Sequence, residues 1–469
     1  MNGIAYYEAT AEQVQSWAYH MSLGDDQQHQ VLTIDSVVEK LDAGSLERAF
    51  TSMVRRHDSL RTFFRIVDGS VKQCVMDYDP ATFSPAWYDM TAGKDRQALI
   101  GEINGAIVEW KWRLRAINRP PLLKCCVFTL PDGKHYLCVL IHHIISDEWS
   151  ASLLHRELVT LYESYRAGSN PKVGPLPIQL KDYARWQREW LKDNGDQVRC
   201  YWKTKLGRIE DTLNPEDLYR QHRLLSGLPR EKDEGAVIAG LTGRERLLRI
   251  LETGKGASYA FHIGSAGYER LLALSEYCNV SIWVVLNASL QLLFYMLSGR
   301  EEPTIAMSVI SRHLPGAESL IGCLMGGVYL HRPVNEDLSI RDFIGEVFCD
   351  FLESAVNIIW DHAEMEVDEE TMRLRTDVFS NFVNKEIVGK KSLYDHEDRV
   401  HQALPSPLYY ALSYTILECP DGLLAYWKYN SQLYSPERIE NMARCHEALW
   451  QAICDSPSML VKEWMRDSH

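Results

Sequence analysis

The stretch that decides the fold is residues 141–150, "IHHIISDEWS". Two adjacent histidines follow an apolar run from His135 to Ile141, and apolar residues recur at helical spacing from Trp149 onward. An almost wholly apolar run predicts a strand that is buried on both faces. The predicted order is therefore buried strand, short polar loop and helix, and functional side chains often collect at such strand ends.

Predicted strands and helices alternate on both sides of this stretch. Before it, helices are expected after Thr10 and after Ser45 as caps, and hairpin turns at Asp68-Gly69 and at residues 131–133. A long helix over about 179–206 and a polar, weakly periodic linker over 207–256 follow it. Beyond the linker, we expect strands near 258–263, 303–311, 326–334, 375–383, 406–418 and 422–430, and helices near 265–278, 281–298, 339–359 and 435–454.

This pattern predicts two α+β domains of mixed α/β layers, one on either side of a connecting segment. The expected boundaries are residues 1–178, 179–257 and 258–469. A chain of 469 residues suits two cores of ordinary size.

Composition limits the partners and the compartment. The formal net charge of −14 disfavours nucleic acid and anionic membranes as partners and is compatible with an amine-bearing substrate. Eleven cysteines without a CxxC pair, and no secretion signal, favour free thiols in the cytoplasm. Cys125 and Cys126 should point to opposite faces of a strand. The uncharged run 280–298 is interpreted as a buried helix rather than a membrane span.

The histidine pair admits several interpretations. His143, at the strand end, could offer one free ring nitrogen as a base, while His142 would pack inward and Asp147 would fix the loop. Two solvated histidines at a polar strand end are the simpler alternative. A metal site is not expected because adjacent strand histidines diverge, and neither a GxSxG elbow nor a phosphate loop is present. A base without a protein nucleophile suits direct acyl transfer between two bound substrates.

Six segments, in order along the chain, carry a family resemblance. They are "TAEQVQSW", "RRHDSLRTFF" (55–64), "LIHHIISDEWSASLLHREL", "KDYARWQREWL" (181–191), "SGREEPTIAMSVISRH" and "LIGCLMGGVYLHRPV", and the C-terminal strand-helix pattern also fits. Together they resemble the condensation domains of nonribosomal peptide synthetases, whose core motif is HHxxxDG. The resemblance implies two chloramphenicol-acetyltransferase-like subdomains in a V-shaped pseudo-dimer with a central tunnel.

The resemblance also implies roles for individual residues. His143 corresponds to the histidine that helps an amine or alcohol attack a thioester carbonyl, by proton transfer or by positioning. His142, Asp147 and Arg61 would support the site, with Asp147 paired to Arg61. Four further positions are expected to contact substrate: Glu148, Trp149, Ser150 and Gly326.

The implied donor is an acyl or aminoacyl group on the phosphopantetheine arm of a carrier protein, and the protein itself is expected to bind no cofactor or metal. We expect a free-standing, amide- or ester-forming enzyme of natural-product biosynthesis. The alternatives are a non-catalytic recruitment domain and an acyl-CoA-dependent acyltransferase of the same fold.

Two positions depart from the family pattern. Glu148 replaces the glycine of HHxxxDG, and "LMGG" at 324–327 replaces FVNT, so the asparagine is missing. Glu148 either turns outward at the helix N-terminus, where the helix dipole favours a carboxylate, or lines the acceptor channel and binds the ammonium group of a small free amine.

Overall fold

The computed structural model of the chain describes residues 3–22, 31–92, 95–209, 256–359, 378–383, 410–419 and 421–467. These residues form two compact units. Unit 1 holds the residues up to Gly195 together with Ile310–Met325, and unit 2 holds Asp196–Val309 and the described residues from Gly326 onward. The division differs from the predicted boundaries because one continuous helix crosses the boundary between the units, and because a segment from the second half of the sequence folds with the first. Most of the predicted linker lies outside the described residues.

Unit 1 contains two sheets, with strand orders β2-β7-β6-β5 and β1-β4-β3. Its strands are β1 (Ile4–Glu8), β2 (Val31–Val38), β3 (Thr62–Val67), β4 (Ser70–Met76), β5 (Ala86–Asp89), β6 (Leu123–Thr129) and β7 (His135–His142). Its α-helices are α1 (Ala11–Ser22), α2 (Ala43–Arg56), α3 (Pro80–Phe83), α4 (Arg96–Leu114), α5 (Glu148–Arg166) and the first part of α6 (Leu180–Leu206). The described residues of unit 1 also form the short 3-10 helices η2 (Asp58–Arg61), η3 (His143–Ile145) and η7 (Ala317–Ser319).

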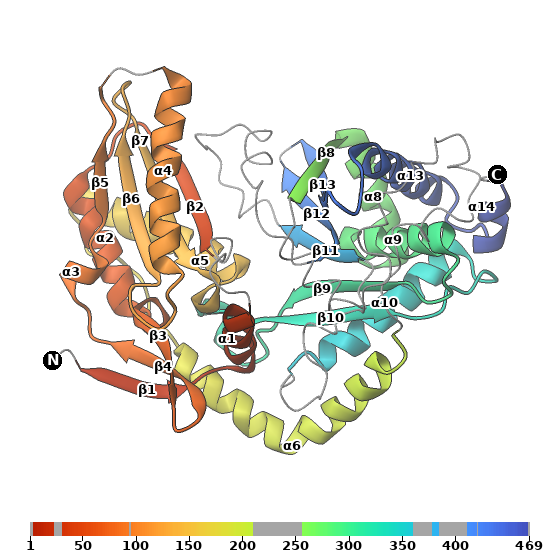
Figure 1. Cartoon of the computed structure of the whole chain (residues 1–469), viewed down its shortest axis with the longest axis horizontal. Helices are drawn as coiled ribbons and strands as arrows, with labels where there is room; N and C mark the ends of the chain where they lie inside the picture. Colours follow the sequence, from red (N-terminus) through yellow and green to blue (C-terminus); the bar gives the residue numbers. More distant parts are fainter. Residues whose placement is uncertain are drawn as a thin grey trace. The chain divides into compact units, whose positions relative to one another are not determined.

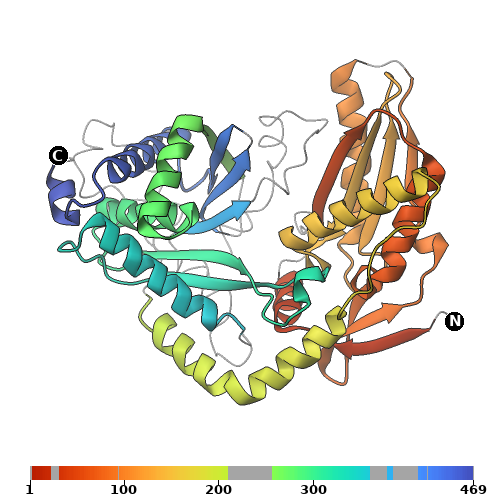
Figure 2. The same ribbon diagram turned by 180° about the vertical axis from the view of Figure 1, so that it is seen from behind.

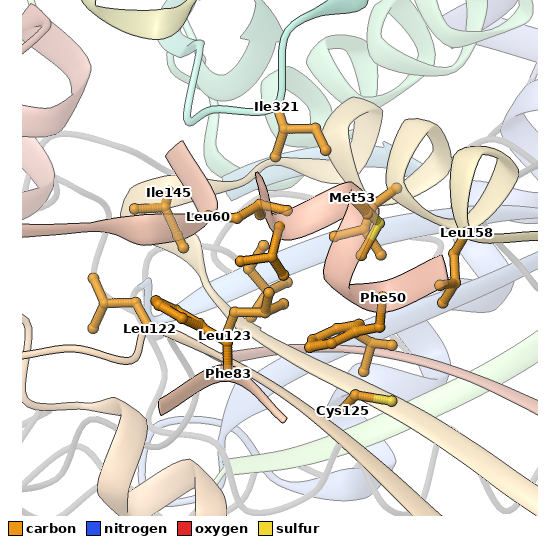
Figure 3. Close-up of a cluster of buried hydrophobic side chains, with 14 of the residues drawn as sticks. Phe50, Met53, Leu60, Phe83, Leu122, Leu123, Cys125, Ile145, Leu158 and Ile321 are labelled. Carbon is orange, nitrogen blue, oxygen red and sulfur yellow. The ribbon is translucent and has the colours of Figure 1, made fainter. Parts of the chain in front are cut away.

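Strand β7 is an inner strand of the four-stranded sheet and is buried on both faces, as predicted. Ile141 and Cys125 join the hydrophobic cluster that α2 and α5 cover (Figure 3). Leu140 and Cys126 join the cluster that α4 covers on the opposite face. Figure 1 shows this sheet from the α4 side, and Figure 2 shows it from the α2 and α5 side. The predicted divergence of Cys125 and Cys126 is therefore confirmed, and both are free thiols.

Capping residues and turn residues set the ends of several helices and strands in unit 1. Thr10 and Gln13 bond reciprocally, the Thr10 Oγ1 accepting from the Gln13 amide at 3.2 Å and the Gln13 Oε1 accepting from the Thr10 amide at 3.1 Å, which is a capping box. The expected cap at Ser45 is wrong. Asp42 caps α2 instead, because its carboxylate accepts from the Ser45 amide at 2.7 Å. Asp68 and Gly69 both adopt positive φ and form the predicted hairpin turn.

Unit 2 is built on a six-stranded sheet of order β10-β9-β11-β12-β13-β8. Its strands are β8 (Gly256–Gly264), β9 (Thr304–Ile310), β10 (Met325–His331), β11 (Val378–Val383), β12 (Leu412–Cys419) and β13 (Gly422–Asn430). Its helices are the end of α6, α8 (Ser265–Cys278), α9 (Ile282–Ser298), α10 (Ile340–Val356), α13 (Pro436–Asp455) and α14 (Val461–Asp467). Pairing is parallel from β9 through β11 to β12 and antiparallel from β12 through β13 to β8. Mixed sheets covered by helices confirm the α+β prediction for both units.

Helix α9 contains most of the uncharged run 280–298, which has nearly the length of a membrane span. Most of its side chains are buried inside unit 2, as expected of a core helix. Among the described helices, no single one has the length and apolar character to cross a membrane. Only α8 and α9 taken together pass that test, and they are bent by 95° where they meet.

A buried ion pair holds the end of α6 in unit 2. Lys205 donates to the Asp350 carboxylate of α10 at 2.6 Å and to the Ser354 hydroxyl at 2.8 Å. The other Asp350 oxygen accepts from the His331 amide of β10 at 2.9 Å. Desolvation lowers the pKa of Lys205, although the Asp350 charge opposes it. Because the carboxylate and the ammonium both have several bonding partners, the pair fixes α6, α10 and β10 to one another.

Candidate active site

The histidine turn begins where β7 ends. The His142 ring is completely buried, and its Nδ1 accepts a hydrogen bond from the Ile144 amide at 3.1 Å, which caps η3. The Ile144 carbonyl in turn accepts from the Gln13 side chain of α1 at 3.4 Å. His142 therefore packs inward, as predicted, and the next ring, His143, is only partly buried.

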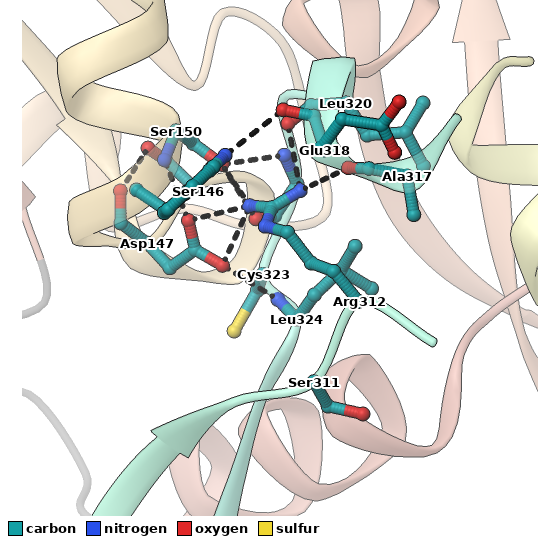
Figure 4. Close-up of polar contacts among 12 residues, drawn as sticks. Ser146, Asp147, Ser150, Ser311, Arg312, Ala317, Glu318, Leu320, Cys323 and Leu324 are labelled. Carbon is teal, nitrogen blue, oxygen red and sulfur yellow. Dashed lines mark hydrogen bonds and ion pairs between the residues drawn. The ribbon is translucent and has the colours of Figure 1, made fainter. Parts of the chain in front are cut away.

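Asp147 is the structural centre of the site. Its carboxylate is fully buried and caps α5, accepting from the Ser150 amide at 2.7 Å. Arg312 contacts both of its oxygens through Nη2, at 2.9 and 3.0 Å, and the Leu324 amide donates to Oδ2 at 3.0 Å (Figure 4). The Arg312 guanidinium is itself held by the carbonyls of Ala317 and Leu320. The buried carboxylate thus has a charged partner and two backbone donors, the condition under which a buried charge is tolerated.

The predicted pairing of Asp147 with Arg61 is wrong. Arg61 ends η2 and pairs with Asp58, three residues earlier, at 2.6 Å. Its other nitrogens donate to the backbone carbonyls of Val54 and Met76, so its donors are used locally. Arg61 supports the turn into β3, whereas the partner of Asp147 comes from the segment between β9 and β10.

Ser150 has a structural role that contradicts its expected contact with substrate. Its hydroxyl donates to the Gly322 carbonyl at 2.9 Å and accepts from the Gly322 amide and from Arg312, each at 3.0 Å. One donated and two accepted hydrogen bonds use all the bonding capacity of a hydroxyl group. The residue is also fully buried, so Ser150 fastens the segment containing Gly322 to α5.

Glu148 and Trp149 remain accessible at the start of α5. The Trp149 side chain is 40% exposed, and its indole nitrogen donates to the Glu318 carbonyl at 2.9 Å. Glu148 is the first residue of the helix and is partly buried. A carboxylate in the first turn is favoured by the helix dipole, which agrees with one of the two interpretations of Glu148 and does not exclude the other.

Two residues of the site were not predicted. Cys323 lies with its Sγ 3.9 Å from Nδ1 of His143, and burial together with the negative charge of Asp147 raises the pKa of its thiol well above the usual range. Glu12 on α1 is buried, and both of its oxygens accept from the Gln187 side chain at 3.0 Å. Burial raises the pKa of Glu12 against these hydrogen bonds. Nothing in the spacing of either residue indicated the site, because both reach it through tertiary packing.

Comparisons with known proteins agree on one family. Residues 5–237 match the family model described as condensation domain. The chain is 27% identical over 428 residues to a linear gramicidin synthase polypeptide of Brevibacillus parabrevis, and the match covers 89% of this chain and 5% of that protein.

The chain belongs to the condensation-domain family.

Solved condensation-type domains share the fold. The condensation domain from monacolin K polyketide synthase MokA matches with a TM-score of 0.74 at 16% identity, over 97% of this chain and 99% of that one. The X-domain from teicoplanin biosynthesis matches with a TM-score of 0.70 at 18% identity, over 97% and 96% of the two chains. The first relatives are far longer, since this condensation domain spans 5–8% of the linear gramicidin synthase polypeptides that it matches.

The missing asparagine of the condensation-domain motif has a packing explanation in unit 2. Gly326, which replaces it, is buried in β10. A Cβ atom at this position would lie 2.3 Å from Cγ1 of Ile358 and 3.1 Å from the Ile358 carbonyl oxygen. The space that a side chain would need is therefore occupied by Ile358, and Gly326 acts in packing, which contradicts its expected contact with substrate.

One serine-histidine pair in the core of unit 2 of this condensation domain is not a catalytic dyad. The Ser289 hydroxyl contacts Nε2 of His446 at 2.7 Å in the core of unit 2. Both residues are completely buried, and burial lowers the pKa of His446 to about 3. Substrate cannot reach this pair. Among the residues that the structure describes, no group of three or more metal-ligating side chains is placed to hold a metal ion.

Proposed function

We propose that this condensation domain joins an acyl or aminoacyl group, carried as a thioester on the phosphopantetheine arm of a carrier protein, to an amine, forming an amide. An alcohol acceptor would give an ester by the same step. Family membership and the nonribosomal peptide synthetases among the relatives support this reaction class. The observation that carries the proposal is the partly buried His143, which directly follows β7 in the short turn that ends at the fully bonded Asp147.

The proposed step is a direct displacement. The acceptor nitrogen attacks the thioester carbonyl carbon, a C–N bond forms, the C–S bond breaks, and the pantetheine sulfur leaves. The nitrogen loses one proton and the sulfur gains one, so a group that can accept a proton and then donate it serves both events. His143 is such a group, and among the described residues none bonds to its Nε2. Holding both substrates beside this ring supplies the positioning part of catalysis.

We further propose that Glu148 binds the ammonium form of a small free amine, which releases one proton to solvent before the neutral amine attacks the thioester. The charge of Glu148 reaches the site, since it is one of the carboxylates that raise the pKa of the Cys323 thiol. Glycine at this position, as in the family motif, would leave room for a second carrier-bound chain, whereas a glutamate adds volume and negative charge. A small cationic acceptor fits that change better than a tethered one.

One assay tests the reaction. An acyl group is supplied on a carrier protein or on coenzyme A, with a panel of amines and alcohols, and products are measured by mass spectrometry. We expect product from the carrier-bound donor, and a loss of about 100-fold or more in His143→Ala. His155→Ala is the matched control, because His155 lies further along α5 and is also partly buried. Equal product from His143→Ala and wild type would refute the proposal. No product from any donor would favour a recruitment domain, and a preference for coenzyme A would favour the acyl-CoA alternative.

The Glu148 proposal has its own measurement. Glu148→Gln keeps the shape and removes the charge, and we expect it to raise the KM for a free amine about tenfold with little change in kcat. Glu148→Gly should act in the same direction and improve the use of carrier-bound acceptors. If both variants keep the wild-type KM for the free amine, Glu148 only complements the helix dipole.

A further inference from the structure

Cys323 lies between two residues whose backbones are hydrogen-bonded to the start of α5. The residue before it, Gly322, donates to and accepts from the Ser150 hydroxyl. The residue after it, Leu324, donates to the Asp147 carboxylate at 3.0 Å. These bonds fix the backbone on either side of Cys323, and the close approach of the segment to α6 depends on Gly322, where a Cβ would meet the Leu180 side chain at 2.7 Å.

The fixed backbone sets the position of the thiol. Cys323 is only 6% exposed, and its Sγ lies 3.9 Å from Nδ1 of the His143 ring. Sulfur bonds are longer than those of oxygen, so this separation is within reach of a weak S–H···N or N–H···S bond. The contact joins residues 180 positions apart, and both belong to unit 1.

The surroundings make Cys323 a partner rather than a nucleophile. A nucleophilic cysteine needs a lowered pKa, usually from a cationic neighbour or a helix N-terminus. Burial and the carboxylates of Asp147, Glu12 and Glu148 raise the pKa of Cys323 instead, so the thiol stays protonated at neutral pH. A neutral thiol beside an imidazole ring orients the ring without competing with it for the thioester.

We propose that Cys323 is a positioning residue for His143. Its sulfur accepts a hydrogen bond from Nδ1–H, which fixes the ring orientation, places the tautomeric proton on Nδ1 and leaves the lone pair of Nε2 for the proton of the acceptor. The proposal rests on the function proposed above, in which His143 serves the acceptor. It also extends the role of Asp147, because the carboxylate that caps α5 holds the backbone from which the thiol reaches His143. The partner of a histidine's second nitrogen commonly sets which nitrogen is available.

The test combines kinetics with a measurement that needs no turnover. Cys323→Ala should lower kcat about fivefold, the effect of losing one weak hydrogen bond, with KM nearly unchanged. Cys323→Ser should recover part of the loss, because a hydroxyl can still engage Nδ1. Cys126→Ala is the matched control: Cys126 is a buried thiol of the same unit on the α4 side of the sheet, and its loss should lower thermal stability but not kcat.

The ¹⁵N chemical shifts of the His143 ring, assigned by comparison with His143→Ala, test the contact itself. We expect one tautomer in wild type and a mixture in Cys323→Ala. Adding Cys323→Ala to His143→Ala should cause no further loss of kcat. Unchanged ring shifts in Cys323→Ala, or a further loss in the double variant as large as that of Cys323→Ala alone, would overturn the positioning role. An inactive wild type would instead reject the proposed function, and the ring shifts would still decide whether Cys323 engages His143.

Discussion

Arg312 contacts both carboxylate oxygens of Asp147 across 165 positions of the sequence. Removing one partner of a buried pair leaves an uncompensated charge, so Arg312→Ala should lose about 3–5 kcal/mol of unfolding free energy in urea titrations. A double-mutant cycle with Asp147→Asn should give a strong coupling for Arg312 and nearly none for Arg61, whose partner is Asp58. Equal coupling energies for the two arginines would contradict the observed pairing.

Glu12 should make the protein less stable as the pH rises. Burial raises the pKa of Glu12 in the folded state. Both states hold the proton in acid; as the pH rises past the unfolded value near 4.5, the unfolded chain ionises first and the folded state is disfavoured. Glu12→Gln does not titrate and can still accept from Gln187. The melting temperature of Glu12→Gln minus that of wild type should therefore increase from pH 4 to pH 8. A difference that stays constant over this range would refute the prediction.

Gly326 should resist substitution because of Ile358. Gly326→Ala forces a Cβ against that side chain and should cost about 1–3 kcal/mol, a cost that Ile358→Ala should partly relieve in the double variant. Gly345→Ala is the control, since it lies within α10, where an added Cβ would meet no atom within 4 Å, and it should stabilise the helix by about 0.5–1 kcal/mol. Chemical denaturation of the four variants measures whether each change lowers or raises the free energy of unfolding. A neutral Gly326→Ala would show that β10 can move away from Ile358.

His446 should make unit 2 sensitive to acid. Its pKa is lowered to about 3 in the folded state by burial, whereas the unfolded ring titrates near 6.5. Between these values the unfolded chain binds a proton that the folded one does not, so stability falls as the pH drops below 6.5, by up to about 1.4 kcal/mol per pH unit. His446→Gln should flatten this dependence in melting curves, and a dependence as steep as that of wild type in His446→Gln would contradict the prediction.

The fold was largely predictable because its signals are local. The continuous apolar run placed β7, the two-residue period of a strand separated Cys125 from Cys126, and the Asp68-Gly69 turn marked a hairpin that the structure confirms. Short elements such as β1 and β5 carried too little periodicity to be predicted. The cap of α2 was misplaced by three residues because Asp42 and Ser45 are both good capping residues, and only the backbone shows which one accepts the bond.

The candidate site was predictable only in part, for a physical reason. His142, His143 and Asp147 are neighbours in sequence, so one motif revealed all three. Arg312 and Cys323 come from a segment of the second half that folds with unit 1, and sequence spacing does not encode such a return. Arg61 was a reasonable partner for Asp147 by motif, but its own donors are taken by Asp58 and two nearby carbonyls.

The return of residues 310–325 to unit 1 limits how the protein can be divided or recombined. A fragment that stops at the end of unit 1's first stretch would lack Arg312 and leave the Asp147 carboxylate buried without its counter-charge. In a chimera that exchanges everything after the connecting segment, Arg312 and the segment that binds the start of α5 would both come from the other homologue. A chimera that keeps the site intact must therefore transfer residues 310–325 together with the amino-terminal half. Two separate stretches of the sequence have to be exchanged as one.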